Sequence, residues 1–92
     1  MQSPITLDAL RALDAIDRNG SCAAAAKSLF KVPSALTYTV KKLEDDLNVV
    51  LFDRSKQKAQ LTSAGKLILE HGRESLIATD KLESAVKQLD SG

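Results

Sequence analysis

Few side chains in this 92-residue chain have a type and spacing that could catalyse a reaction or bind a metal. We interpret the single histidine, His71, as a surface residue of a helix, because its helical neighbours Leu67 and Ile68 are not metal ligands. The acidic run at 44–46 cannot converge on one substrate atom, since consecutive residues of a helix point in different directions. We interpret this run as a solvated acidic helix end.

Glycine and cysteine usage also argues against catalysis. The glycines stand singly and form no phosphate-binding loop: Gly20, Gly65, Gly72 and Gly92. The lone Cys22 lies in an alanine-rich segment, where a small buried thiol is favoured over a redox sensor. We expect no enzymatic activity, no metal and no cofactor. With one cysteine, no signal-peptide pattern and no long apolar run, we also expect a cytoplasmic protein without a membrane partner.

A second kind of chemistry, contact with nucleic acid, is suggested by four polar residues at helical spacing. Ser34, Thr37, Tyr38 and Lys41 stand at offsets of 0, 3, 4 and 7 and would share one helix face. They supply donors, acceptors and an amphipathic ring but no acid, which suits contacts with base edges and phosphates. Taken alone, the same pattern also fits an ordinary solvated helix face.

The elements that would position this face are three helices. Apolar residues recur at spacings of three from about 6 to 18, after a possible Thr6 cap and before the stop signal Asn19-Gly20. Ser21 can cap a short second helix over 22–29. A third helix begins at Pro33 and carries an apolar stripe: Leu36, Val40, Leu43 and Leu47.

The second and third helices fit a helix-turn-helix. Small residues in the second helix, Ala23 to Ala26, allow the third to cross it closely. The connector at 30–32 is short. The stripe of the third helix would hold it in place and leave the polar face exposed for a major groove.

A hairpin and a long helix complete the chain. The segment 49–52 is β-prone and 60–61 resumes after a polar, basic tip, which predicts a small two-stranded wing. From Thr62 to about 90 the sequence predicts one helix, on the order of 40 Å long, which is too long to pack wholly on the small body. Its apolar stripe therefore implies a partner, although packing back on the first helix is the alternative. The stripe residues assigned to dimerisation are Leu76, Ala78, Leu82, Val86 and Leu89.

The expected fold class is mainly α: a winged helix-turn-helix of three helices plus a two-stranded β wing, followed by a long linker helix. We assign residues 1–61 to the winged helix-turn-helix and 62–92 to the linker or dimerisation helix.

The order and spacing of several short motifs resemble the N-terminal DNA-binding domain of LysR-type transcriptional regulators. The resemblance covers about residues 5 to 66, and the following helix looks like the linker helix of that family through residue 90. The motifs are Gly20-Ser21, Ala24-Ala25, Ser34-Ala35, Leu43-Glu44, Leu51-Phe52 with Arg54, Leu61-Thr62 and Ala64-Gly65.

The resemblance implies a role for each matching residue. The recognition helix begins near Pro33, and Arg54 matches the wing arginine that reaches phosphates or the minor groove. Ser21 and Thr62 stand at helix N-termini, where they are placed to bind phosphate. The predicted DNA-binding residues are Ser21, Pro33, Ser34, Thr37, Tyr38, Lys41, Arg54, Lys56, Lys58 and Thr62.

Four positions depart from the family pattern. Tyr38 stands where Arg or Lys is usual, which removes a bidentate reader of guanine and predicts a less G-dependent half-site. Thr39 replaces a common Gln or His, Val32 a capping Ser, and Asn48 a Gly. The last change is conservative in backbone terms, because both residues accept a positive φ.

The resemblance also implies partners. Family members pair through the linker helix, so we expect a homodimer on a pseudo-palindromic promoter site in double-stranded DNA, and a tetramer for the longer protein. A small-molecule effector would act only through a C-terminal domain that is absent from this chain. The alternatives are a winged-helix module that contacts protein or RNA, and a small enzyme, which lacks a plausible site.

The net charge of +1 conceals a pattern. Residues 21–43 carry four lysines and no acid, 44–53 carry four acids and no base, and 54–66 carry four bases and no acid. The two basic blocks coincide with the predicted helix-turn-helix and wing, which favours a nucleic-acid partner. The modest total predicts weak non-specific affinity and tight binding only when two subunits act together.

Overall fold

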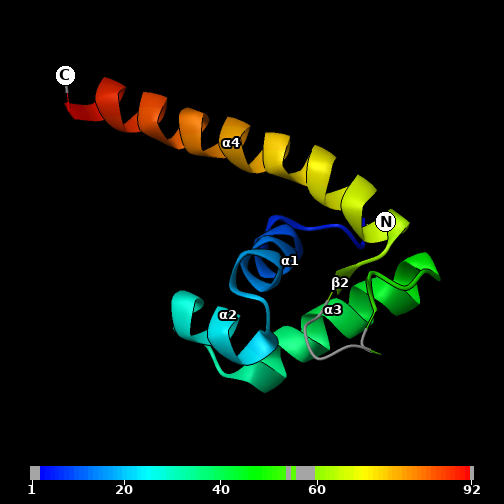
Figure 1. Cartoon of the computed structure of the whole chain (residues 1–92). Helices are drawn as coiled ribbons and strands as arrows, with labels where there is room; N and C mark the ends of the chain where they lie inside the picture. The colour runs from blue at the N-terminus through cyan, green and yellow to red at the C-terminus, as the bar shows by residue number, and fades with distance from the viewer. Residues whose placement is uncertain (1–2, 54, 56–59, 92) are drawn as a thin grey trace.

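The computed structural model describes residues 3–53, 55 and 60–91, without the side chains of 90 and 91. Figure 1 shows the shorter helices and the wing grouped in one body, from which a long helix extends toward the C-terminus. The predicted fold class is confirmed. The elements in chain order are α1 (Leu7–Asn19), α2 (Cys22–Leu29), α3 (Pro33–Leu47), β1 (Phe52–Asp53), β2 (Gln60–Leu61) and α4 (Ser63–Ser91).

Both of the first two helices begin, and α1 also ends, at residues whose chemistry predicts it. The Thr6 hydroxyl oxygen accepts a hydrogen bond from the Ala9 N–H at 3.1 Å, and the Ser21 hydroxyl oxygen accepts one from the Ala24 N–H at 3.1 Å. Gly20 ends α1 at φ 85°, a conformation that glycine adopts without strain. Each cap satisfies an N–H that the helix itself leaves unpaired.

The turn between α2 and α3 is closed by the backbone. Phe30 has φ 56°, a left-handed conformation that is costly for a residue other than glycine, and its side chain is 96% exposed. The Lys31 N–H donates to the Ala26 carbonyl at 2.9 Å, which fixes the reversal of the chain. Pro33 then occupies the start of α3, where no N–H is required.

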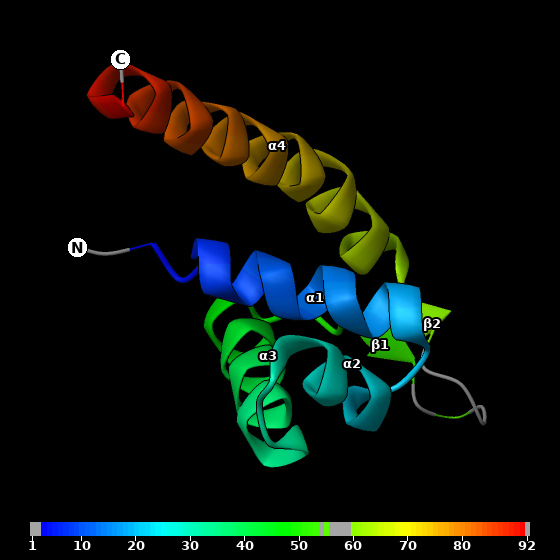
Figure 2. The ribbon, with the colours of Figure 1, turned by 90° about the vertical axis from the view of Figure 1, so that its left-hand side faces the viewer.

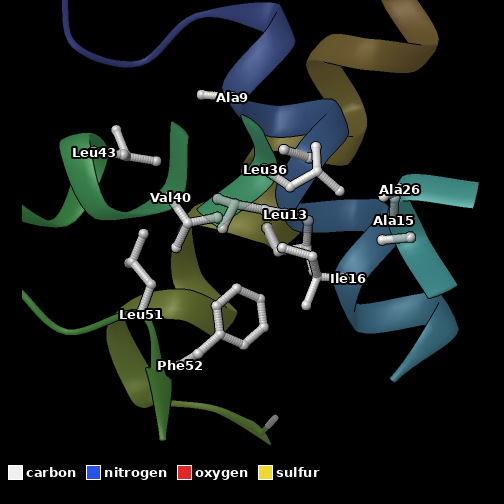
Figure 3. Close-up of a cluster of buried hydrophobic side chains, with 13 residues drawn as sticks. Ala9, Leu13, Ala15, Ile16, Ala26, Leu36, Val40, Leu43, Leu51 and Phe52 are labelled. Atoms are coloured by element: carbon white, nitrogen blue, oxygen red, sulfur yellow. The ribbon is translucent and has the colours of Figure 1, made fainter. Parts of the chain in front are cut away.

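The core lies where α1, α2 and α3 meet the wing and the start of α4. Leu36, Val40 and Leu43 of α3 are buried and Leu47 is half-buried, as its spacing predicts. Figure 3 shows Leu36, Val40 and Leu43 of α3 in one cluster with Leu13 of α1 and with Leu51 and Phe52. Burial of this apolar surface holds α3 against the body and leaves its opposite face in solvent.

The wing is shorter than the β-prone sequence suggests. β1 and β2 pair antiparallel, with Phe52 opposite Leu61 and Asp53 opposite Gln60. The expectation of strand structure over 49–52 is wrong for 49–51. The Val49 N–H donates to the Glu44 carbonyl at 3.1 Å, and the Leu51 N–H donates to the Glu44 carboxylate at 2.7 Å. The N–H groups of Val49 and Leu51 therefore bond to the end of α3, whereas the carbonyls of Val50 and Leu51 accept from Thr62 directly after β2.

Helix α4 packs on the body along its first half only. Figure 2 shows α4 leaving the wing beside α1 and diverging from α1 toward the C-terminus. Leu69 is buried in the core, and a Cβ added at Gly72 would lie 2.6 Å from a methyl carbon of Leu10 on α1. The second half of α4 is exposed at every position from 80 to 89. The expected projection of this helix is therefore present, and the alternative of packing on α1 holds for its first half.

Candidate nucleic-acid interface

The outer face of α3 presents the polar residues selected by their spacing. Pro33, Ser34, Thr37, Tyr38 and Lys41 are all exposed, and Tyr38 is exposed to 68%. They start at the N-terminus of α3 and extend over its first two turns, opposite the buried stripe. The structure thus brings these five predicted residues together on one surface.

Hydroxyl groups on α3 are partly engaged with their own helix. The Thr37 hydroxyl donates to the Pro33 carbonyl at 3.1 Å, and the Thr39 hydroxyl donates to the Ala35 carbonyl at 2.9 Å. Each oxygen keeps lone pairs that can accept a hydrogen bond. Thr39 lies on a different side of the helix from Thr37, in a cleft that α1 also lines through Asp8 and Arg11.

The lysines of α3 are paired with acids one turn further along. Lys41 Nζ lies 3.3 Å from an Asp45 carboxylate oxygen, and Lys42 Nζ lies 3.6 Å from one of Asp46. All four side chains are exposed, so each pair contributes only about 0.3–0.5 kcal/mol to the stability of the fold. A phosphate that approaches Lys41 must compete with a nearby carboxylate.

Two helix N-termini were selected as phosphate sites. Ser21 is exposed and its hydroxyl oxygen caps α2. Thr62 is more constrained: its hydroxyl accepts from the Gly65 N–H at 3.1 Å and donates to the Val50 carbonyl, while its own N–H donates to the Leu51 carbonyl. What Thr62 can offer a phosphate is therefore the start of α4, with the hydroxyl already committed.

The basic tip of the wing, Arg54, Lys56 and Lys58, lies outside the described residues. The structure does show how the wing is attached to α3. Glu44 is half-buried, and its carboxylate accepts the Leu51 N–H at 2.7 Å just before β1. Glu44 therefore differs from the solvated acidic end expected for 44–46, whereas Asp45 and Asp46 fit that expectation.

Gly65 holds the wing close to α4. A Cβ at this position would lie 2.3 Å from the Leu51 carbonyl oxygen and 2.9 Å from a Leu61 methyl carbon. Neither the backbone oxygen nor the paired strand can move away cheaply, so only glycine fits. The Ala64-Gly65 motif thus has a packing reason in this chain.

The far half of α4 carries the apolar residues assigned to dimerisation. Ala78, Leu82, Val86 and Leu89 are exposed, Leu82 to 63%. Leu76 differs, because it is half-buried where α4 approaches Arg11 and Arg18 of α1. Large exposed apolar side chains at one end of a small domain are the pattern expected of an interaction surface.

An ion network joins α4 to α1. Arg73 Nε donates to Asp14 at 2.8 Å, a terminal nitrogen of Arg73 donates to Asp17 at 2.8 Å, and Arg18 Nε donates to Asp14 at 2.9 Å. Burial alone would raise the pKa of Asp14, but the hydrogen bonds from Arg73 and Arg18 outweigh it and hold that pKa below its ordinary value. Hydrogen bonds to Asp14 and Asp17 raise the pKa of Arg73.

The described part of the chain shows no group of three or more His, Cys, Asp and Glu side chains that could hold a metal ion. His71 is exposed and has one carboxylate, Glu74, a turn further on. Cys22 is half-buried and packs against the core. None of the described helices is long and apolar enough to span a membrane.

Four positioning residues were missed by sequence reasoning: Glu44, Gly65, Gly72 and Arg73. A glycine inside a helix costs about 1 kcal/mol relative to alanine, so Gly65 and Gly72 did carry a signal of close packing. The contacts of Glu44 and Arg73 could not be read from local spacing, because their partners lie 7 and 56–59 residues away in the chain.

Comparison with known families gives a match over the whole winged body. The family described as bacterial regulatory helix-turn-helix protein, lysR family, matches residues 7–66. The HTH-type transcriptional regulator YhaJ of Escherichia coli O157:H7 is 54% identical over 88 residues, which cover 96% of this chain and 30% of YhaJ. The HTH-type transcriptional regulator PunR of Escherichia coli strain K12 is 50% identical over 64 residues, covering 70% of this chain and 21% of PunR.

Solved structures with DNA are among the similar folds. The CbnR_DBD–DNA complex has a TM-score of 0.82 and 32% identity, covering 92% of this chain and 98% of that chain. The BenM_DBD/catB site 1 DNA complex has a TM-score of 0.89 and 25% identity, covering 96% and 99%. The chain thus matches those DNA-binding domains almost end to end, and spans 30% or less of the YhaJ and PunR sequences.

Proposed function

Because the chain belongs to the LysR family of bacterial helix-turn-helix regulators and is the DNA-binding domain of such a regulator, we propose that it binds a pseudo-palindromic promoter site as a dimer. Helix α3 enters the major groove, and the wing contacts the adjacent backbone or minor groove. The family consists of transcription regulators and is non-enzymatic. Residues 1–61 act as the DNA-binding unit, and 62–92 as the linker and dimerisation helix.

The observation that carries this proposal is the exposed polar face of α3. A helix whose apolar side is sealed in the core has one face left for recognition, and here that face is free of acids over its first two turns. Ser34, Thr37 and Tyr38 reach base edges or the adjoining backbone, and Pro33 sets the start of the helix. A methyl group on Thr37 suits contact with a thymine methyl.

Phosphate contacts would frame the groove on both sides. Ser21 at the N-terminus of α2 and the first turn of α4 at Thr62 offer backbone N–H groups and the positive end of a helix dipole. Lys41 adds a cation from α3, and the wing adds Arg54, Lys56 and Lys58. Such contacts fix register on the duplex without reading its sequence.

Dimerisation would use the exposed half of α4. Paired antiparallel with a second copy, the stripe of Ala78, Leu82, Val86 and Leu89 would bury the apolar side chains that the body leaves in water. A two-fold dimer places two recognition helices roughly 34–36 Å apart, or a multiple of that distance. This geometry requires two half-sites related by a dyad.

The remaining activities belong to the longer protein. We propose that it forms a tetramer, responds to a small-molecule effector through a C-terminal domain and acts in the bacterial cytoplasm.

The decisive experiment is selection of binding sites from random double-stranded DNA at about 0.15 M salt. We expect a dyad-symmetric consensus whose complex survives competitor DNA in a mobility assay. Equal binding to unrelated DNA sequences, or preference for RNA, would contradict the proposal and support the alternative of a module for protein or RNA contacts.

A matched pair of threonines tests the orientation of α3. In Thr37→Ala the DNA face loses a hydroxyl, and we expect about fivefold weaker specific binding, roughly 1 kcal/mol. Thr39→Ala removes a hydroxyl with the same bond to its own helix but on the side facing α1, and its affinity should stay within about twofold. A larger loss for Thr39→Ala than for Thr37→Ala would refute this orientation.

The dimer has its own test. Leu82→Asp would place a carboxylate in the apolar interface, and we expect the dimer dissociation constant to rise about 100-fold, or about 2.7 kcal/mol, by analytical ultracentrifugation. Ser84→Asp adds the same charge to an exposed polar position two residues away and serves as the control. A wild-type chain that stays monomeric at micromolar concentration would contradict the dimer.

A further inference from the structure

Helix α4 packs on the body along its first half, and two of its contacts with α1 lie near the middle of the helix. Gly72 lies against Leu10, and Arg73 bonds to Asp14 and Asp17. From about residue 80 onward every described side chain of α4 is exposed, and Figure 1 and Figure 2 both show the C-terminal part of α4 diverging from the body. Residues 72 and 73 thus lie late in the stretch of α4 that packs on the body, shortly before its exposed half, so their contacts bear directly on the direction in which α4 leaves the body.

The Arg73 contacts are directional. Asp14 and Asp17 stand one turn apart on α1, and a single guanidinium reaches both with two bonds of 2.8 Å. A guanidinium is planar and its donors have fixed geometry, so two bonds to separate carboxylates restrain rotation as well as distance. Arg18, which like Asp14 belongs to α1, donates to the Asp14 carboxylate and so orients it toward Arg73.

The steric contact acts in the same place. At Gly72 the two helices approach so closely that a Cβ would lie 2.6 Å from a methyl carbon of Leu10. A glycine at the point of closest approach lets the helices touch and serves as the pivot. The ion network next to it then selects one crossing angle around that pivot.

The length of the far half of α4 converts a small change in crossing angle into a large displacement of its end. From Arg73 to Leu89 the helix rises about 24 Å, at about 1.5 Å per residue. A change of about 10° in the crossing angle would move the far end by about 4 Å, close to the roughly 3.4 Å step of one base pair. A small change in the crossing angle at residues 72 and 73 would therefore change the distance between the two half-sites by about one base pair.

We propose that Arg73, through Asp14 and Asp17, is a positioning residue that sets the spacing between the two half-sites of the operator. This inference rests on the proposed dimer. The body reads each half-site through α3, and the angle at residues 72 and 73 determines how far apart the two bodies are held. Arg73 bonds to α1 and not to α3, so its loss should alter the spacing without altering the half-site sequence.

The test is a selection from a library in which two copies of the selected half-site are separated by spacers of different length. The wild-type chain should enrich one spacer strongly. Arg73→Gln removes the charge and the pair of guanidinium hydrogen bonds to Asp14 and Asp17. We therefore expect at least two adjacent spacer lengths to be enriched within about threefold of each other. The sequence of the half-site should not change.

Control variants separate a change in the direction of α4 from a loss of folding. Arg11→Gln removes an arginine of α1 that lines the same cleft beside α4 but forms its ion pair, at 3.7 Å, with Asp8 on its own helix, and it should keep the wild-type spacer. Asp17→Asn removes the charge of one of the two carboxylates that Arg73 bonds to, and leaves Asp14 bonded to both Arg73 and Arg18. Its spacer distribution should therefore lie between those of wild type and Arg73→Gln. Thermal denaturation of each variant shows whether the body is folded.

The outcomes are distinct. If Arg73→Gln and Asp17→Asn are folded, dimeric and still enrich the wild-type spacer alone, Arg73 is only structural and the inference is overturned. If the wild-type chain itself shows no preferred spacer, the proposed dimeric function fails and this inference fails with it.

Discussion

Helices α3 and α4 are both amphipathic, yet they present opposite faces to solvent. The apolar stripe of α3 is sealed by the body, with Leu36 only 2% exposed, and its polar face is left outside. The far half of α4 has no body to cover it, and Leu82 and its neighbours remain exposed. The same kind of sequence pattern therefore produces two different surfaces.

The difference predicts two different partners. A polar, acid-free helix face suits a charged partner whose phosphates and base edges it can bond, and such binding weakens as salt rises. An apolar stripe suits a second apolar surface, and that contact depends little on salt. The near half of α4 is intermediate, because it packs on α1 through Leu69 and Arg73.

The largest expected effect compares one substitution on the two helices. Leu36→Ala removes a core side chain of α3, and we expect the free energy of unfolding to fall by about 3 kcal/mol. Leu82→Ala changes an exposed side chain of α4 and should leave the stability of the monomer unchanged to within about 0.5 kcal/mol. Urea denaturation measures both free energies of unfolding, provided that the protein concentration is kept below the range in which the dimer forms. Equal losses would mean that the far half of α4 folds back on the body.

The next effect concerns the polar face of α3. Tyr38→Arg restores a bidentate donor, and we expect a gain in preference for guanine at one base pair of about 1–3 kcal/mol. Selection from random DNA with both proteins gives the comparison. An unchanged consensus would show that residue 38 does not read a base.

A smaller effect tests how α4 is attached. The pKa of Asp14 is lowered in the folded protein, so its ion network stabilises the fold above the unfolded pKa of about 3.9 and loses this contribution as pH falls through the lower folded value. Asp14→Asn should cost about 1 kcal/mol at pH 7 and progressively less toward about pH 3.

Asp8→Asn is the control for this measurement, because Asp8 is exposed and its partner Arg11 lies 3.7 Å away. Its unfolding free energy should track that of the wild type at both pH values. A loss for Asp14→Asn that does not shrink in acid would argue against an ionic role for Asp14.

The smallest effect concerns the lysine at the end of the polar face. Lys41→Gln should weaken DNA binding uniformly across sequences and reduce the slope of log affinity against log salt by about 0.9. Asp45→Asn removes the acid that lies 3.3 Å from Lys41 and should strengthen binding at low salt. If both variants weaken binding, Lys41 and Asp45 do not compete in the way described.

Local chemistry made much of the fold predictable. Thr6, Ser21, Gly20 and Asn48 act within a few residues of their own position, so the caps and helix ends followed from residue type. The stripe on α3 was predictable for the same reason, since a period of 3.6 defines one face. The polar face opposite it was then determined by elimination.

The wing was predicted less well, because its hydrogen bonds come from elsewhere. Val49 and Leu51 have the side chains of a strand, but their N–H groups bond to Glu44 at the end of α3. A propensity for strand structure gives way where another acceptor lies nearer. No pattern within 49–52 reports that acceptor.

By itself, the sequence determined the helices, their caps, the helix-turn-helix and the family, because those depend on contacts between residues close in the chain. Only the tertiary structure decided which part of α4 is covered and at what angle it departs. Those depend on Gly72 meeting Leu10 and on Arg73 meeting Asp14 and Asp17, pairs more than fifty residues apart. Such contacts form only when the whole body has assembled around them.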